Sequence, residues 1–158
     1  MHRESRIVPY PADLMFAIVA DVERYPEFLP WVTGLRVLSR AKEGAKEILL
    51  AEMIVGFRTL RERYTSRVVL DPSNRTIDVT QTEGPFRTLE NHWRFTPEGQ
   101  GARVEFSIDF EFKNRLLNAV AGNAFALAQK RMTRAFEERA KKLSQQIPPP
   151  LAGGGVER

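Results

Sequence analysis

The chain has 158 residues, of which 42% are hydrophobic and 28% charged, a balance typical of one soluble domain with a sizeable core. It contains no cysteine, which excludes disulfides and thiolate chemistry, and its formal net charge of +4 favours anionic partners such as lipid headgroups or RNA. No segment approaches the ~20 apolar residues that span a bilayer, and residues 1–9 lack the apolar core of a secretory signal, so we expect a cytoplasmic bacterial protein.

The first part of the chain predicts one strand followed by two helical segments. Residues 3–9 indicate the strand, and Pro11 fits the first turn of a helix that continues to about Ala20. Residues 21–30 are interrupted by Pro26 and Pro30, which predicts a short helix and a turn.

The middle of the chain predicts strands joined by short connections. The expected strands are residues 31–39, 45–55, 58–70, 75–82 and 86–96. A tight turn around Gly56–Phe57, a turn at residues 71–74 and a loop at residues 97–101 separate them. Consecutive strands with short links favour an antiparallel meander.

The last third predicts a half-buried strand that runs into one long helix. Large apolar residues alternate with polar ones from Val104 to Phe112, as a strand with one buried face requires. The helix over residues 114–144 carries an apolar stripe and would be about 45 Å long. Its several alanines either leave a hollow beneath the helix or let bulky strand residues pack close, and the sequence does not decide between these alternatives.

Strand alternation places a few polar groups on the inner face. Glu62 and Tyr64 share the more apolar face of their strand, and Asn91 shares that of Leu89, Trp93 and Phe95, while His92 faces outward. These three polar residues are candidate anchors for a ligand. The alternative is that Glu62 pairs with a neighbouring arginine and that Asn91 satisfies a backbone group.

Apolar residues also occur where exposure is expected. They either rim an opening that contacts a membrane or plug the end of the sheet: Phe28, Leu29, Trp31, Phe57 and Phe86. Arg58, Arg61, Arg63 and Arg67 form a basic patch that would favour an anionic surface or simply remain solvated.

Catalytic signals are sparse. No His, Asp and Glu cluster has metal-ligand spacing, and no nucleotide-binding or serine-nucleophile motif occurs. We therefore expect no enzymatic activity, metal or required cofactor, although an acid–base enzyme that uses Glu62 or Tyr64 is an alternative.

Three segments carry a family resemblance: YPADLMFAIVADVERYPEFLPWV, VEFSIDFEFKNRLLNAVAGNAF and RMTRAFEERA. Together they resemble the coenzyme Q-binding branch of the polyketide cyclase family, within the START-like, helix-grip superfamily. The resemblance implies an α+β domain over residues 1–146, in which a seven-stranded antiparallel sheet wraps around the C-terminal helix and encloses an apolar cavity. We expect the Pro- and Gly-rich residues 147–158 to be disordered.

The resemblance further implies a ubiquinone-like ligand, bound without chemistry, by a carrier at the inner membrane that supports respiration. Bacterial relatives named ribosome-association toxin offer the alternative of a protein that binds the large ribosomal subunit; no DNA partner is expected. The expected cavity lining is Leu35, Val37, Met53, Tyr64, Leu89, Asn91, Trp93, Phe95, Phe106, Phe110, Leu117, Ala121, Ala124, Phe125, Ala128 and Met132.

Overall fold

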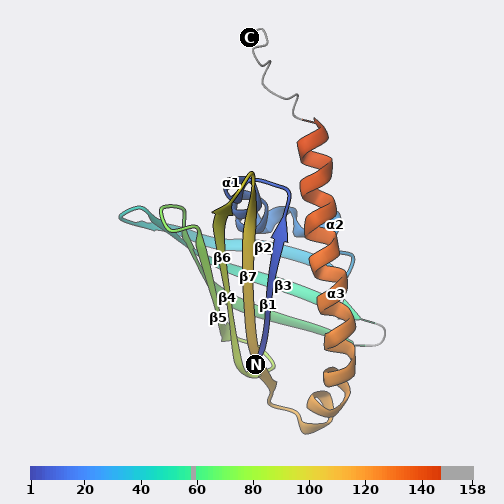
Figure 1. The fold of residues 1–158 in the computed structure, drawn as a ribbon. Helices are drawn as coiled ribbons and strands as arrows, with labels where there is room; N and C mark the ends of the chain where they lie inside the picture. Colours follow the sequence, from blue (N-terminus) through green and yellow to red (C-terminus); the bar gives the residue numbers. More distant parts are fainter. Residues whose placement is uncertain (58–59, 147–158) are drawn as a thin grey trace, which may run out of the picture.

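The structure is a computed structural model that describes residues 1–57 and 60–146, except for the side chains of Phe57, Leu60, residues 120–127 and Gln146. Seven strands and one long C-terminal helix form an α+β domain (Figure 1). The elements are β1 (His2–Val8), α1 (Ala12–Ala20), a 3-10 turn η1 (Val22–Arg24), α2 (Tyr25–Phe28), β2 (Val32–Glu43), β3 (Lys46–Phe57), β4 (Leu60–Asp71), β5 (Thr76–Glu83), β6 (Phe86–Glu98), β7 (Gly101–Phe112) and α3 (Arg115–Gln146).

The strands form one antiparallel sheet in the order β1-β7-β6-β5-β4-β3-β2. The six strands from β2 to β7 follow one another as the predicted meander, and β1 closes the edge beside β7. The sheet bends strongly, so that β2, β3 and β4 run across the direction of β1, β6 and β7 (Figure 1). The predicted helix-grip fold is therefore confirmed, and the bend gives the sheet a concave face.

Several strand boundaries differ from those predicted from the sequence. β3 continues through Gly56 and Phe57, which were expected to form a turn but pair with Arg61 and Leu60 of β4. β2 continues to Glu43, four residues beyond Ser39, because Arg40 to Glu43 pair with Lys46 to Leu49 of β3. The loop predicted at residues 97–101 is a tight turn, since Pro97 and Glu98 still pair with Ala102 and Gly101. Gly99 occupies the left-handed region there with φ 60°, which a glycine adopts without steric cost.

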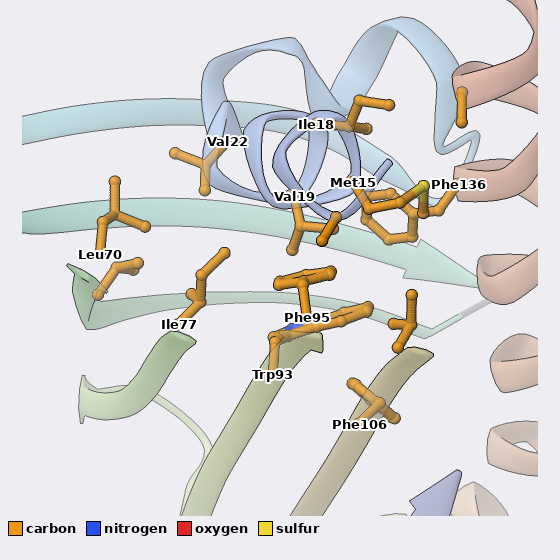
Figure 2. Close-up of a cluster of buried hydrophobic side chains, with 14 of the residues drawn as sticks. Met15, Ile18, Val19, Val22, Leu70, Ile77, Trp93, Phe95, Phe106 and Phe136 are labelled. Carbon is orange, nitrogen blue, oxygen red and sulfur yellow. The ribbon is translucent and has the colours of Figure 1, made fainter. Parts of the chain in front are cut away.

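One end of the concave face holds the main hydrophobic core. Phe95 is only 1% exposed and packs edge-to-face on Phe16 of α1, with ring centroids 6.0 Å apart. Trp93 stacks on Phe95 at 5.9 Å and meets Phe136 of α3 at 5.5 Å. Figure 2 shows Val19 of α1, Phe136 of α3 and Trp93 of the sheet pointing into the same cluster. We call this filled region the main core.

A second, smaller cluster fills the other end of the same face. Phe86, Leu89 and Phe112 are buried there, and the Phe86 and Phe112 rings stack at 4.6 Å. Leu117, in the first turn of α3, packs against this cluster. Asn118 fixes the start of the helix, because its amide accepts from the Phe112 N–H at 2.7 Å and donates to the Phe112 carbonyl at 3.0 Å.

Candidate ligand-binding site

Between the two clusters, the concave face is only half covered. Along β3, β4, β5, β6 and β7 the inner residues change from buried to half-buried on leaving the main core, and Leu35 of β2 is half-buried beside them. Val68 and Leu49 are 4% and 1% exposed, whereas Tyr64 and Met53 further along the same strands remain partly exposed. We call this region the central belt, and it consists of Leu35, Met53, Tyr64, Val79, Asn91, Ile108 and Phe110.

Helix α3 passes from one cluster to the other. Leu117 packs against the second cluster, and Met132 packs against the main core. These residues are 15 positions apart, which corresponds to about 22 Å of helix at ~1.5 Å per residue. Mid-sheet apolar side chains under a helix would be fully enclosed in a filled core, so their partial exposure indicates space beside the belt.

The C-terminal half of α3 contacts β1 through one hydrogen bond and one ion pair. Thr133 donates to Glu4 at 2.8 Å, and Arg6 forms an ion pair with Glu137 at 2.5 Å. A cavity of only about 30 Å³ lies next to these contacts, lined in part by Met15, Trp93, Phe106 and Phe136. This end of the interior is therefore too full for a lipid.

Tyr64 is the most conspicuous polar group in the belt. Within the part of the chain that the structure describes, its hydroxyl donates to the Met53 sulfur at 3.2 Å, and a thioether is a weak acceptor. Burial raises the pKa of Tyr64 to about 12, so the hydroxyl stays protonated at neutral pH. Gly84 allows the β5–β6 turn to approach, because a Cβ there would lie 2.5 Å from the Tyr64 Cβ.

Ser66, two residues from Tyr64 on the same inner face, was given no role by sequence reasoning. It is 4% exposed, and its Oγ has no hydrogen-bond partner among the described residues. Buried hydroxyls are nearly always paired, so this group calls for an explanation. A lone serine between apolar inner residues was the available sequence signal, but its missing partner became visible only in three dimensions.

The amide of Asn91 is already engaged within the wall. Its nitrogen donates to the Ser107 carbonyl at 2.9 Å, and its oxygen accepts from the Trp93 indole N–H at 2.9 Å. The alternative in which Asn91 satisfies a backbone group is therefore the arrangement in the structure, although the residue still lines the belt.

Glu62 follows Tyr64 toward the end of β4 and is half-buried. Its cross-strand neighbour on the inner face is Val55. Within the described part of the chain it has no ion pair, so the predicted alternative of an arginine partner is not found there.

Several residues predicted to line a cavity belong to the filled clusters. Phe95 and Phe106 are 1% and 5% exposed in the main core, where Trp93 joins them, and Leu89 lies in the second cluster. The rest of the described residues predicted to line the cavity are half-buried: Leu35, Val37, Met53, Tyr64, Asn91, Phe110, Leu117, Ala128 and Met132. The side chains of Ala121, Ala124 and Phe125 lie outside the described residues.

The residues predicted to rim an opening also divide into buried and half-buried ones. Leu29 is buried at 3% and Phe86 at 9%, so both plug the interior and do not rim an opening. Phe28 and Trp31 are half-buried, and the Arg139 guanidinium lies 5.1 Å from the centre of the Phe28 ring. The Phe57 side chain lies outside the described residues, as does Arg58.

The outer face of β4 carries the predicted basic patch. Arg61, Arg63 and Arg67 are exposed, and none has an ion pair with another described residue. From here on the name basic patch refers to these three arginines, because Arg58 lies outside the described residues. Elsewhere on the convex face His92 is exposed as predicted and bonds Asp78 at 2.6 Å.

Within residues 1–57 and 60–146, no helix has the length and apolar content needed to cross a bilayer. No group of three or more His, Cys, Asp or Glu side chains there is placed to hold a metal ion.

A curved sheet that grips a long helix over a half-covered apolar face defines a START-like protein. A family profile described as polyketide cyclase / dehydrase and lipid transport matches residues 8–137. The chain belongs to this family, as its sequence segments predicted.

The chain is similar to several known proteins. The ribosome association toxin RatA of Pseudomonas aeruginosa is 37% identical over 89% of this chain and 95% of its own. A mitochondrial coenzyme Q-binding protein, COQ10 homolog B of Xenopus laevis, is 34% identical over 96% of this chain, which spans 62% of the relative's length. The solution structure of an 18 kDa protein from Caulobacter crescentus is 43% identical, with a TM-score of 0.78 over 92% of this chain and 99% of that one.

Proposed function

We propose that the protein binds a ubiquinone-like polyprenyl lipid against the central belt, beneath α3, and carries or shields it without changing it chemically. The observation that supports this most directly is the half-buried apolar belt between two filled clusters. The family description, which includes lipid transport, and the name of the Xenopus relative agree with such a ligand.

Transfer energetics make this proposal reasonable. Burial of one five-carbon isoprene unit contributes on the order of 3–4 kcal/mol, at ~0.8 kcal/mol per carbon. A few buried units are therefore enough for useful affinity. Since ligand pockets hold only about 300–1,000 Å³, a long tail would protrude, and we propose that the protein collects and releases its ligand at the inner membrane.

The test is uptake of ubiquinones of increasing tail length by protein stripped of lipid. We expect one ligand per chain and an affinity that rises with each added isoprene unit up to a limit. The same affinity at all tail lengths would contradict the proposal. Mass spectrometry of lipids extracted from protein purified from its own host would identify the natural ligand.

A second candidate is association with the large ribosomal subunit. The basic patch and the name of the Pseudomonas relative favour it. Contacts between arginine and RNA phosphate weaken as salt rises, so the complex should be lost at high salt. We expect co-sedimentation with large subunits that disappears when Arg61, Arg63 and Arg67 are changed to glutamate. Failure of the unaltered protein to co-sediment at low salt would dismiss this candidate.

A further inference from the structure

We propose that the hydroxyls of Tyr64 and Ser66 form the site for the polar head of the ligand, and that this head is neutral and carries acceptor oxygens. This inference rests on the proposed function, because it assigns the polar end of the same lipid site. The two residues lie on the inner face of β4, two positions apart, which separates them by about 6.6 Å along the strand.

The case for Ser66 begins with its unsatisfied hydroxyl. Its cross-strand neighbours are Ala51 on β3 and Gln81 on β5. Ala51 has no polar side-chain atom. Gln81 is occupied, because its nitrogen donates to the Phe86 carbonyl at 2.8 Å and its oxygen accepts from the Phe86 N–H at 3.1 Å. The hydroxyl of Ser66 therefore lacks an acceptor in the wall beside it, and a bound oxygen would provide one.

Tyr64 complements Ser66 with a second donor. Its bond to the Met53 sulfur is weak enough to be exchanged for a bond to a carbonyl oxygen. Because its pKa is about 12, the phenol keeps its proton and can donate over the whole neutral range. Two donors that lack strong acceptors match a ligand whose head accepts hydrogen bonds but does not donate them, as a quinone ring does.

The charge around this pair selects against an anionic head. Glu62 lies next along the same face, half-buried and without an ion pair among the described residues. The arginine on the inner face of β1, Arg6, is already paired with Glu137. A phosphate or carboxylate near Tyr64 would face the Glu62 carboxylate without a compensating cation from these groups, whereas a neutral carbonyl would not.

The experiment compares binding of three probes that share a short isoprenoid tail. The probes are a ubiquinone with two isoprene units, a hydrocarbon of matching length without oxygen, and the corresponding diphosphate. The proteins are the unaltered chain, Ser66→Ala, Tyr64→Phe and a control, Ser39→Ala, which makes the same atomic change at an exposed strand position.

We expect Ser66→Ala and Tyr64→Phe each to weaken quinone binding about 3- to 10-fold, as loss of one hydrogen bond does, and to leave hydrocarbon binding unchanged. Ser39→Ala should bind like the unaltered protein, and the diphosphate should bind more weakly than the quinone. Ser66→Ala should also keep or raise the melting temperature of the empty protein, because it removes an unpaired buried hydroxyl.

Different failures have different meanings. Quinone affinities that are equal in the unaltered protein and in both variants would overturn the head site while the lipid function stands. Parallel loss of quinone and hydrocarbon binding would show a change of shape and would also overturn it. Strong diphosphate binding would refute a neutral head. If the unaltered protein bound neither the quinone nor the hydrocarbon, the proposed function would fail, and the head site with it.

Discussion

The two ends of β4 and β6 differ in burial. Val68 and Phe95, near α1, are enclosed in the main core. Tyr64 and Asn91, on the same two strands but nearer the first turns of α3, remain half-buried. The strands and their alternation are continuous between the two regions, so the difference arises from what packs on them. Helix α1 and the C-terminal half of α3 fill the main core with Phe16 and Phe136. We therefore expect stability to depend mainly on the main core, and the proposed ligand binding on the central belt.

The largest expected effect separates these regions by truncation. Phe95→Ala should lower the free energy of unfolding by about 3–5 kcal/mol, because it opens a cavity among fully buried rings. Met53→Ala should cost only about 1 kcal/mol, below the ~2–5 kcal/mol of a fully buried methionine, since Met53 already has open space beside it. Urea denaturation of both variants measures the difference, and equal losses would show that the belt is as tightly packed as the main core.

Enlargement of a side chain should affect ligand binding more in the central belt than in the main core. Val79→Phe, in the central belt, should leave stability within about 1 kcal/mol of the unaltered protein and reduce quinone affinity at least ~10-fold, because the new ring occupies the ligand's space. Val68 is directly opposite Val79 on β4, and Val68→Phe is the matched control. We expect this control to lose about 1–3 kcal/mol from overpacking. Normal quinone uptake by Val79→Phe would move the site elsewhere.

Sequence alone predicted most of the fold, because the fold follows from local patterns. Alternation from Val104 to Phe112 identified β7, the prolines at 26 and 30 limited α2, and the long apolar stripe predicted α3. These signals depend on residues a few positions apart, which a sequence shows directly. The meander order followed from the short connections between strands.

The candidate site was harder to predict, because it depends on distant residues. Phe95 and Tyr64 are both aromatic residues on inner faces, and Phe95 is enclosed because Phe16 of α1 and Trp93 pack against its ring. Leu29 looked exposed beside prolines yet is enclosed in the main core. Asn91 finds an acceptor on the backbone of Ser107, 16 residues away. No single-strand pattern contains that information.

Asn91 marks the border between the two regions and provides a smaller test. Asn91→Leu keeps the size of the side chain but leaves the Trp93 indole N–H without its acceptor and the Ser107 carbonyl without the amide donor. We expect a loss of about 1–3 kcal/mol of stability from the unpaired groups. In a Trp31→Phe background, the emission of Trp93 alone reports the change in its surroundings. Unchanged stability and emission would mean that the Asn91 hydrogen bonds do not fix the position of Trp93.

The smallest effects should appear at opposite ends of the pH scale. At the packed end, Asp71 accepts a hydrogen bond from the Asn74 side chain, which lowers the pKa of the Asp71 carboxyl below its ordinary value of 3.8. A lowered pKa gives stability that is present above that ordinary value and is lost as pH falls through the folded-state pKa. In the belt, burial raises the pKa of Tyr64 from 10.0 to about 12, so its contribution is present below pH 10 and is lost as pH rises toward 12.

Substitution of each group should therefore remove one limb of the stability profile. Asp71→Asn should flatten the fall below about pH 4, and Tyr64→Phe should reduce the fall above about pH 10. Part of the alkaline fall should remain in Tyr64→Phe, because burial and the charge of Asp21 still raise the pKa of Tyr25 when Tyr64 is absent. Melting temperatures measured across pH in the two variants test this assignment. If Tyr64→Phe altered the acid limb, or Asp71→Asn the alkaline one, the two regions would be coupled more closely than their packing indicates.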